Sequence, residues 1–308
     1  MSRSVAVAPE ALRVLVTGVV DYAGLFPPAA LDMASAVANF ATYRASDDAW
    51  VLGRFVLNAT RLDEWSAAVN ALSASESAAW HGARLSALLS GEFSRESERI
   101  AAFNDAAALP VRIDVAEART HTIDSVLATA AAMPDDVTLY CEIPHRDDPA
   151  YLLDAVHSAG VRAKIRTGGV TPDAFPMPGD IVRFLRRCVE RGVTAKATAG
   201  LHHPLRGDFR LTYQPDAVRG MMYGFVNVFL CAAALRVGVG DAVAGAILLE
   251  QDAETIVASA EAVRYVRGGV LEFMIDRAAL TAFRETGLVA FGSCSFREPV
   301  DELAMLFA

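Results

Sequence analysis

Short runs rich in β-branched residues alternate with longer runs rich in alanine and leucine, and this alternation constrains the fold more than any other feature. The short runs lie at residues 16–22, 51–58, 84–90, 111–117, 138–143, 162–167, 194–199 and 288–293. Helical patterns lie at residues 29–45, 62–72, 95–107, 123–132, 149–158, 181–191 and 300–307. Eight strands with helices between them predict a parallel sheet closed into a (β/α)8 TIM barrel, forming one domain over residues 1–308.

Both ends of this pattern leave alternatives open. The first strand could be helical up to Gly18. The interval between the last two strands is far longer than one crossover helix needs, so we expect a helical insertion at about residues 205–287. Its predicted helices cover residues 217–237, 252–267 and 277–286, with a rival strand at residues 270–275.

The most apolar region of the chain runs from Met221 to Leu249. Asn227, Arg236 and Asp241 interrupt it, so no run reaches the roughly 18 apolar residues that a membrane span needs. We therefore predict a buried helix pair and no membrane insertion. The length of this apolar insertion also suggests a homodimer or other homo-oligomer.

Composition narrows the class of function. The net charge is −9 and the pI about 5.2, so the overall field does not attract nucleic acid. The four cysteines are widely spaced and form no CxxC motif, which predicts neither disulfides nor structural zinc. Pro9 and Glu10 interrupt the apolar stretch at the start of the chain, which makes it a poor signal peptide. We expect a cytoplasmic protein that acts on a small molecule.

Only two of the 28 basic residues are lysines, Lys164 and Lys196, and the other 26 are arginines. If arginine supplies the surface charge everywhere, a surviving lysine is more often needed as lysine, since it can lose its proton and form an imine. Both lie at matching places in the sixth and seventh predicted strands. The alternative is a buried ion network that fills the barrel top without a catalytic role.

Active sites of such barrels lie at the carboxyl ends of the strands. Period-two alternation turns Lys164 and Arg166 inward in strand six and Lys196 in strand seven, and it turns Glu142 inward in strand five. A charge directed at the layer between barrel and helices would be dry and unpaired, so we expect these four side chains to converge at the barrel mouth. Further candidates for substrate contact at strand ends are Asp21, Asn58, Thr198 and either Asp114 or Glu117, depending on the register of strand four.

Because the two lysines lie on neighbouring predicted strands, we expect the charge of each to affect the pKa of the other. Ammonium groups about 5 Å apart repel by about 3 kcal/mol at an effective dielectric near 20, which corresponds to about 2 pKa units. We therefore expect one lysine to approach neutrality, as imine formation requires.

Glycine-rich turns and two histidines follow the last strands. Glycines let backbone N–H groups approach an anion, and barrels often bind phosphate after strands seven and eight. The alternative is that these glycines only form turns, where glycine is common. The adjacent His202 and His203 could contact substrate, shuttle protons or supply a metal ligand. The candidate anion-binding turns contain Gly168, Gly169, Gly200, Gly292, Ser293 and Ser295.

The runs KIRTGG from Lys164 and KATAGL from Lys196 resemble the strand-six and strand-seven motifs of class I aldolases of the deoxyribose-phosphate aldolase type, and GSCS from Gly292 looks like that family's phosphate turn. The resemblance covers the last three strands. It implies Lys164 as the Schiff-base lysine, Lys196 as the cation that lowers its pKa, and an acid carboxylate from an earlier strand.

Three functions follow as hypotheses. The first is a class I carbon–carbon lyase that uses Lys164, Lys196 and Glu142 on a small phosphorylated or carboxylated carbonyl compound, with no metal and no cofactor. The second is a metal-dependent barrel hydrolase or isomerase that uses Glu142, His202 and His203, with the lysines as electrostatic clamps. The third is a non-catalytic binding barrel that acts through the apolar helix at residues 221–235.

Overall fold

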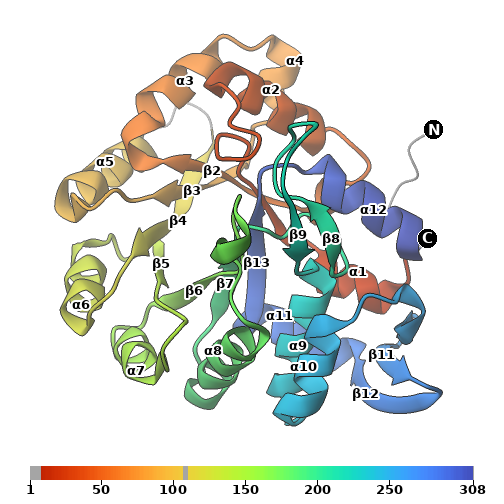
Figure 1. Cartoon of the computed structure of the whole chain (residues 1–308). Helices are drawn as coiled ribbons and strands as arrows, with labels where there is room; N and C mark the ends of the chain where they lie inside the picture. The colour runs from red at the N-terminus through yellow and green to blue at the C-terminus, as the bar shows by residue number, and fades with distance from the viewer. Residues whose placement is uncertain (1–7, 107–109, 308) are drawn as a thin grey trace.

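The computed structural model describes residues 8–106 and 110–307, and its centre is a closed barrel of eight parallel strands (Figure 1). The order around the barrel is β1-β13-β7-β6-β5-β4-β3-β2, so each strand neighbours its successor and the predicted TIM barrel is confirmed. The barrel strands are β1 (Val20–Tyr22), β2 (Leu52–Asn58), β3 (Arg84–Leu88), β4 (Arg112–Arg119), β5 (Thr138–Glu142), β6 (Arg162–Arg166), β7 (Ala195–Thr198) and β13 (Leu288–Ser293).

Helices follow the strands and surround the barrel. Those of the repeating units are α2 (Met33–Arg44), α3 (Leu62–Asn70), α4 (Ala74–Ala78), α5 (Phe93–Ala106), α6 (Ile123–Ala132), α7 (Ala150–Ser158), α8 (Pro178–Arg191) and α12 (Arg297–Phe307). Residue 107, the predicted end of the third helix, lies outside the described residues. At the N-terminal end the helical alternative holds, because α1 (Glu10–Val16) precedes a strand that begins only at Val20.

The insertion between β7 and β13 contains more strand than its sequence suggested. It comprises the hairpin β8 (Gly207–Arg210) and β9 (Arg219–Met222), α9 (Phe225–Arg236), α10 (Asp241–Leu249), a sheet of β10 (Ile256–Ala258), β11 (Ala262–Arg267) and β12 (Val270–Asp276), and α11 (Arg277–Thr286). The rival strand at residues 270–275 is confirmed, and the helix at residues 252–267 is wrong. Gly268 and Gly269 both adopt positive φ, which is the backbone of a tight hairpin turn and ends any helix there.

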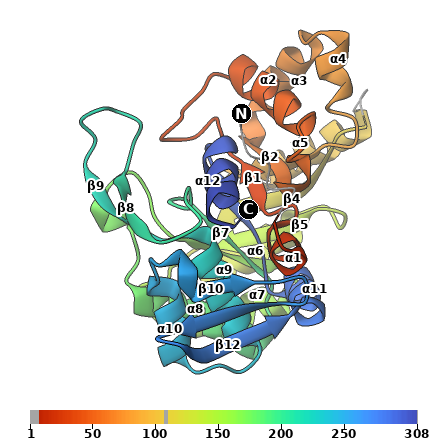
Figure 2. The same ribbon diagram turned by 90° about the vertical axis from the view of Figure 1, so that its right-hand side faces the viewer.

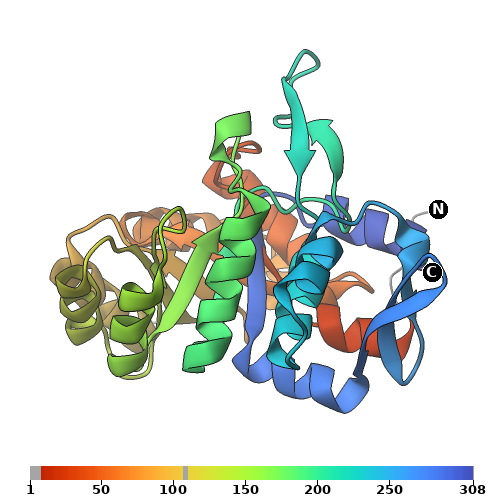
Figure 3. The ribbon, with the colours of Figure 1, turned by 60° about the horizontal axis from the view of Figure 1, so that its bottom comes forward.

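The hairpin and the small sheet lie apart from the barrel wall. The β8–β9 hairpin projects beyond the ends of the surrounding helices (Figure 3). The small sheet lies on the outside of the molecule (Figure 2), where β11 contacts α1 and β12 contacts α11. In the part of the chain that the structure describes, no helix is long and apolar enough to cross a membrane.

Helix α9 is buried on every side and belongs to the barrel's outer layer. All its residues from Phe225 to Leu235 are buried, and Phe225 stacks on Phe291 of β13 with ring centroids 4.8 Å apart. Its one polar interior side chain, Asn227, donates to the carbonyl oxygens of Ile247 and Glu250 at 2.8 and 3.1 Å. The predicted helix pair is confirmed as α9 and α10, and the idea that this apolar helix forms an external binding surface is wrong.

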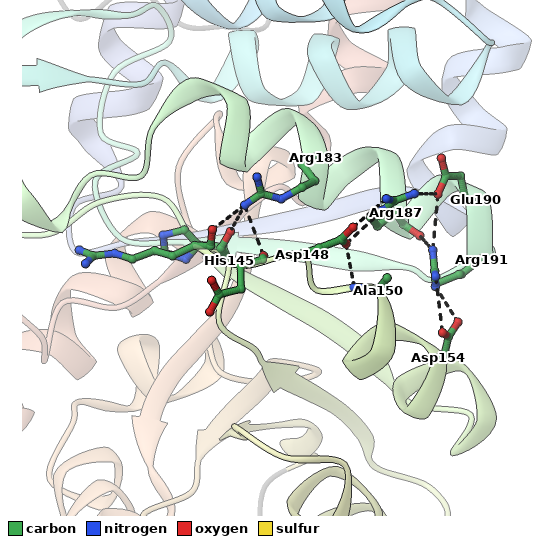
Figure 4. Close-up of polar contacts among 10 residues, drawn as sticks. His145, Asp148, Ala150, Asp154, Arg183, Arg187, Glu190 and Arg191 are labelled. Atoms are coloured by element: carbon green, nitrogen blue, oxygen red, sulfur yellow. Dashed lines mark hydrogen bonds and ion pairs between the residues drawn. The ribbon is translucent and has the colours of Figure 1, made fainter.

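Arginines on α8 clamp the loop that follows β5, the strand that ends at Glu142 (Figure 4). One guanidinium nitrogen of Arg183 donates to the carbonyl oxygens of residues 145, 146 and 147 at 2.9, 2.7 and 3.3 Å. One turn further along α8, Arg187 pairs with Asp148 at 2.7 Å. These contacts fix the path of the chain immediately after one of the candidate catalytic carboxylates.

Candidate functional site

A cavity of about 550 Å³ opens at the carboxyl ends of the barrel strands and brings most of the predicted site residues together. Barrel folds place functional residues at this end, because the loops there come from every strand–helix unit. The predicted residues that line the cavity are Asn58, Glu117, Glu142, Lys164, Arg166, Gly169, Lys196, Thr198, Gly200, His202 and Gly292.

Five predicted residues lie outside the cavity lining. Asp21 is fully buried beneath it and binds Lys196. Gly168 packs closely against the ring of Phe175, and His203 faces α12. The hydroxyls of the predicted phosphate turn contact protein groups: Ser293 accepts from the backbone N–H of Ser295 at 3.4 Å, and the hydroxyl of Ser295 accepts from the backbone N–H of residue 298 at 3.2 Å.

The two lysines are joined by one carboxylate. Glu117 accepts from the Nζ of Lys164 at 2.8 Å with one oxygen and from the Nζ of Lys196 at 2.7 Å with the other. Lys196 also donates to Asp21 at 2.6 Å, and Lys164 lies 2.8 Å from Glu142. In β6 and β7 the two lysines are direct register partners, as alternation predicted.

This pairing reverses the expected electrostatics. Burial alone would raise the pKa of Glu117, but Lys164 and Lys196 hold that pKa far below its usual value. Burial likewise would lower the pKa of Lys196, but Asp21 and Glu117 raise it above the usual value for lysine. The expected repulsion between the two cations is offset by the carboxylate that lies between them.

The register of strand four explains that omission. Glu117, and not Asp114, reaches the cavity, and the hydroxyl of Ser86 in β3 donates to it at 2.6 Å. Asp114 lies three residues earlier in β4, where it accepts two hydrogen bonds from Arg54 at 2.6 and 2.8 Å. The two acidic residues therefore serve different layers of the barrel interior.

The outer wall of the cavity carries three groups in reach of a ligand. Burial alone would raise the pKa of Glu142, but Lys164, Arg119 and Arg166 lower it, so this carboxylate is ionised at neutral pH. Arg119 lies 3.3 Å from Glu142. Arg166 lines the cavity and forms no hydrogen bond or ion pair with any residue in the described ranges 8–106 and 110–307.

The two histidines after β7 pair with two glutamates of α12. The Nδ1 of His202 lies 3.2 Å from Glu298, and the Nδ1 of His203 lies 2.9 Å from Glu302. Burial would lower the pKa of His202, but Cys294 and Glu298 raise it to about 9. Glu142 is not part of this cluster, so the set Glu142, His202 and His203 is not assembled as a metal site.

The sequence matches no protein-family model and no curated protein. Similar solved structures include the spore cortex-lytic enzyme SleL of Bacillus cereus, at 10% identity and a TM-score of 0.38 over 94% of this chain and 73% of that one. A double mutant of organophosphorus hydrolase from Deinococcus radiodurans has 14% identity and a TM-score of 0.38 over 98% of this chain and 96% of that one. At these values the similarity does not extend to a shared activity.

The predicted class I lyase is wrong. Imine formation needs a neutral amine with a free lone pair, whereas the Nζ of Lys164 lies 2.8 Å from both Glu117 and Glu142. Lys196 is held charged by two carboxylates.

Sequence reasoning missed three residues of this region, Arg119, Glu298 and Glu302. Arg119 lies at the end of β4, two residues beyond Glu117, and the same alternation that selected Glu117 turns it toward the mouth. Glu298 and Glu302 are four residues apart on a helix that begins just after the last strand. That i,i+4 spacing at the catalytic end of a barrel is the signal that could have found them.

Proposed function

We propose that this chain is a barrel hydrolase or isomerase that acts on a small anionic molecule by acid–base chemistry, with the two lysines as electrostatic clamps. The observation that carries the proposal is Arg166. Its guanidinium lines the cavity two residues beyond Lys164 on the same strand and forms no hydrogen bond or ion pair in the described part of the chain, while its charge helps to lower the pKa of Glu142. A cation left unpaired in a cavity is a binding site for a carboxylate or phosphate of a ligand.

Glu142 is the group we assign to proton transfer. It is ionised, lines the cavity and is held by contacts on both sides, with Lys164 at 2.8 Å and Arg119 at 3.3 Å. A carboxylate that is fixed and charged in this way accepts a proton from water or from an acidic C–H or O–H bond of the substrate. Negative charge that develops on the substrate is stabilised by Lys164, which is already in place and does not need to reorganise.

Glu117, Lys196 and Asp21 form the support beneath these groups. All three are at least 96% shielded from solvent, and each contacts the next at 2.6 or 2.7 Å. Their role in this proposal is to position Lys164, because Glu117 fixes that ammonium group from below. Glu117 and Lys196 also line the cavity, whereas Asp21 lies outside its lining.

Turnover of a substrate panel tests the assignment. The panel contains small esters, lactones and phosphate esters that carry a free anionic group, together with hydroxy acids and sugar phosphates for isomerisation. We expect Glu142→Gln to lower kcat by about 100-fold or more, and Arg166→Gln to raise KM more than it lowers kcat. Glu64→Gln, at an exposed position on α3, is the matched control.

Two results would contradict the proposal. Full activity in Glu142→Gln would remove its proposed proton acceptor. Binding of small anions without turnover of any panel compound would instead support a binding barrel without catalysis.

We also propose a reducing, cytoplasmic location. All four cysteines are buried and none is paired with another, which fits a compartment where thiols stay reduced. Fractionation of cells that express the native gene would test this, and recovery of the protein outside the cytoplasm would contradict it.

A further inference from the structure

A second cluster of ionisable side chains lies at the seam between the loop after β7 and α12, separate from the lysine–carboxylate network. Glu298 and Glu302 are four residues apart on α12, so both lie on one face of that helix. His203 faces them from the loop. The ligand atoms of these three residues all lie within 4.8 Å of one another, and no other such group of three occurs within residues 8–106 and 110–307.

We propose that His203, Glu298 and Glu302 bind a divalent transition-metal ion of the Zn²⁺ type. One imidazole nitrogen and two carboxylate oxygens form a mixed ligand set that Zn²⁺ and its neighbours in the first transition row accept. Three protein ligands leave a coordination position open, which is the arrangement of catalytic rather than closed structural sites. The site is defined by binding alone and does not depend on the proposed function.

The orientation of His203 supports this assignment. Its ring stacks on Phe209 with centroids 3.4 Å apart, and its side chain is only 8% exposed, so its orientation is fixed by packing. Its Nδ1 lies 2.9 Å from both oxygens of Glu302. Packing therefore holds this nitrogen next to the carboxylate that would share a metal ion with it.

Glu298 and Glu302 bring two carboxylates to one small region. The hydroxyl of Tyr213 donates to Glu298 at 3.1 Å. Glu298 also lies 3.2 Å from the Nδ1 of His202, whose side chain lines the cavity. A bound ion would link the loop after β7 to α12 and so stabilise the part of the cavity wall that contains His202.

Binding of Co²⁺ and Zn²⁺ to the full chain, freed of metal with a chelator, tests the inference without any substrate. We expect one Co²⁺ per chain with visible absorption bands of a nitrogen- and oxygen-ligated ion, and displacement by Zn²⁺. His203→Ala and Glu302→Gln should each weaken binding at least about tenfold. His157→Ala, an exposed histidine on α7, is the matched control and should bind as the unaltered protein does.

Equal affinity in His203→Ala, Glu302→Gln and His157→Ala would overturn the proposal, and so would the absence of any saturable binding to the unaltered protein. Glu302→Gln keeps the size of the side chain, so it remains informative if His203→Ala does not fold. Circular dichroism of each variant shows whether the fold is retained. A failure of the substrate panel would leave this result unaffected, since metal binding is measured alone.

Discussion

Replacing Glu117 by glutamine removes the one negative charge that both lysines share. Its oxygens lie 2.8 and 2.7 Å from the two ammonium nitrogens, and the two lysines are register partners on neighbouring strands about 4.8 Å apart. At an effective dielectric of about 20 they then repel by about 3 kcal/mol. Breaking a buried ion pair from one side costs about 3–5 kcal/mol, so we expect Glu117→Gln to lower the free energy of unfolding by that amount at neutral pH.

The sign of the pH dependence follows from the same charges. With Glu117 neutral, Glu142 still pairs with Lys164 and Asp21 with Lys196. The repulsion between the two buried ammonium groups is no longer offset by a shared carboxylate, so we expect at least one folded-state lysine pKa to fall below the unfolded value near 10.4. The unfolded state then binds more protons between the two pKa values, so stability rises with pH across that window. Glu117→Gln should therefore recover part of its loss between about pH 7 and pH 10, while the unaltered protein should not gain stability there.

Urea denaturation followed by circular dichroism at several pH values measures both effects. Glu64→Gln is the control, because this exposed carboxylate has a single surface ion pair with Arg61 and should cost less than about 1 kcal/mol. A loss in Glu117→Gln as small as that of the control would refute the reasoning. A loss that does not change between pH 7 and pH 10 would show that the two ammonium groups are not the cause.

Three further outcomes are expected. Borohydride reduction with carbonyl compounds should leave Lys164 and Lys196 unmodified in peptide mass spectra, because their carboxylate contacts keep the amines from forming an imine; an adduct at either lysine would restore the lyase hypothesis. The lowered pKa of Glu142 should place the acid limb of the kcat/KM profile below the usual glutamate range, and a limb above about pH 5 would contradict its role as the proton acceptor. Arg183→Ala should speed amide hydrogen exchange in the loop at residues 145–148 and cost about 1–3 kcal/mol, and unchanged exchange there would show that the clamp is not needed.

The sequence located the site better than it described the chemistry. Strand alternation placed Lys164, Arg166 and Lys196 at the barrel mouth, because side-chain direction in a strand is a local property with a period of two. It could not place Glu117 between the lysines, since that depends on the register of β4 against β3, which shifts between Leu85 and Ser86. The contact of Glu117 with both lysines is the reason why the predicted imine chemistry is wrong.

In the insertion, too, the sequence predicts burial correctly but does not predict which segments pair. The hydrophobic character of residues 221–249 determined that α9 and α10 are buried, because so much apolar surface cannot face water. The hairpin β8–β9 and the sheet β10–β12 depend on pairing between segments, and the local pattern at residues 252–267 favoured a helix instead.

The sequence by itself thus determined the barrel, the end of the barrel at which the candidate site lies and the inward direction of its charged residues. Only the tertiary structure decided which charges meet: one carboxylate bridges two lysines, and two glutamates of α12 face two histidines after β7. The physical reason is that periodicity and burial are encoded locally, whereas the state of a buried charge depends on partners brought together from distant parts of the chain.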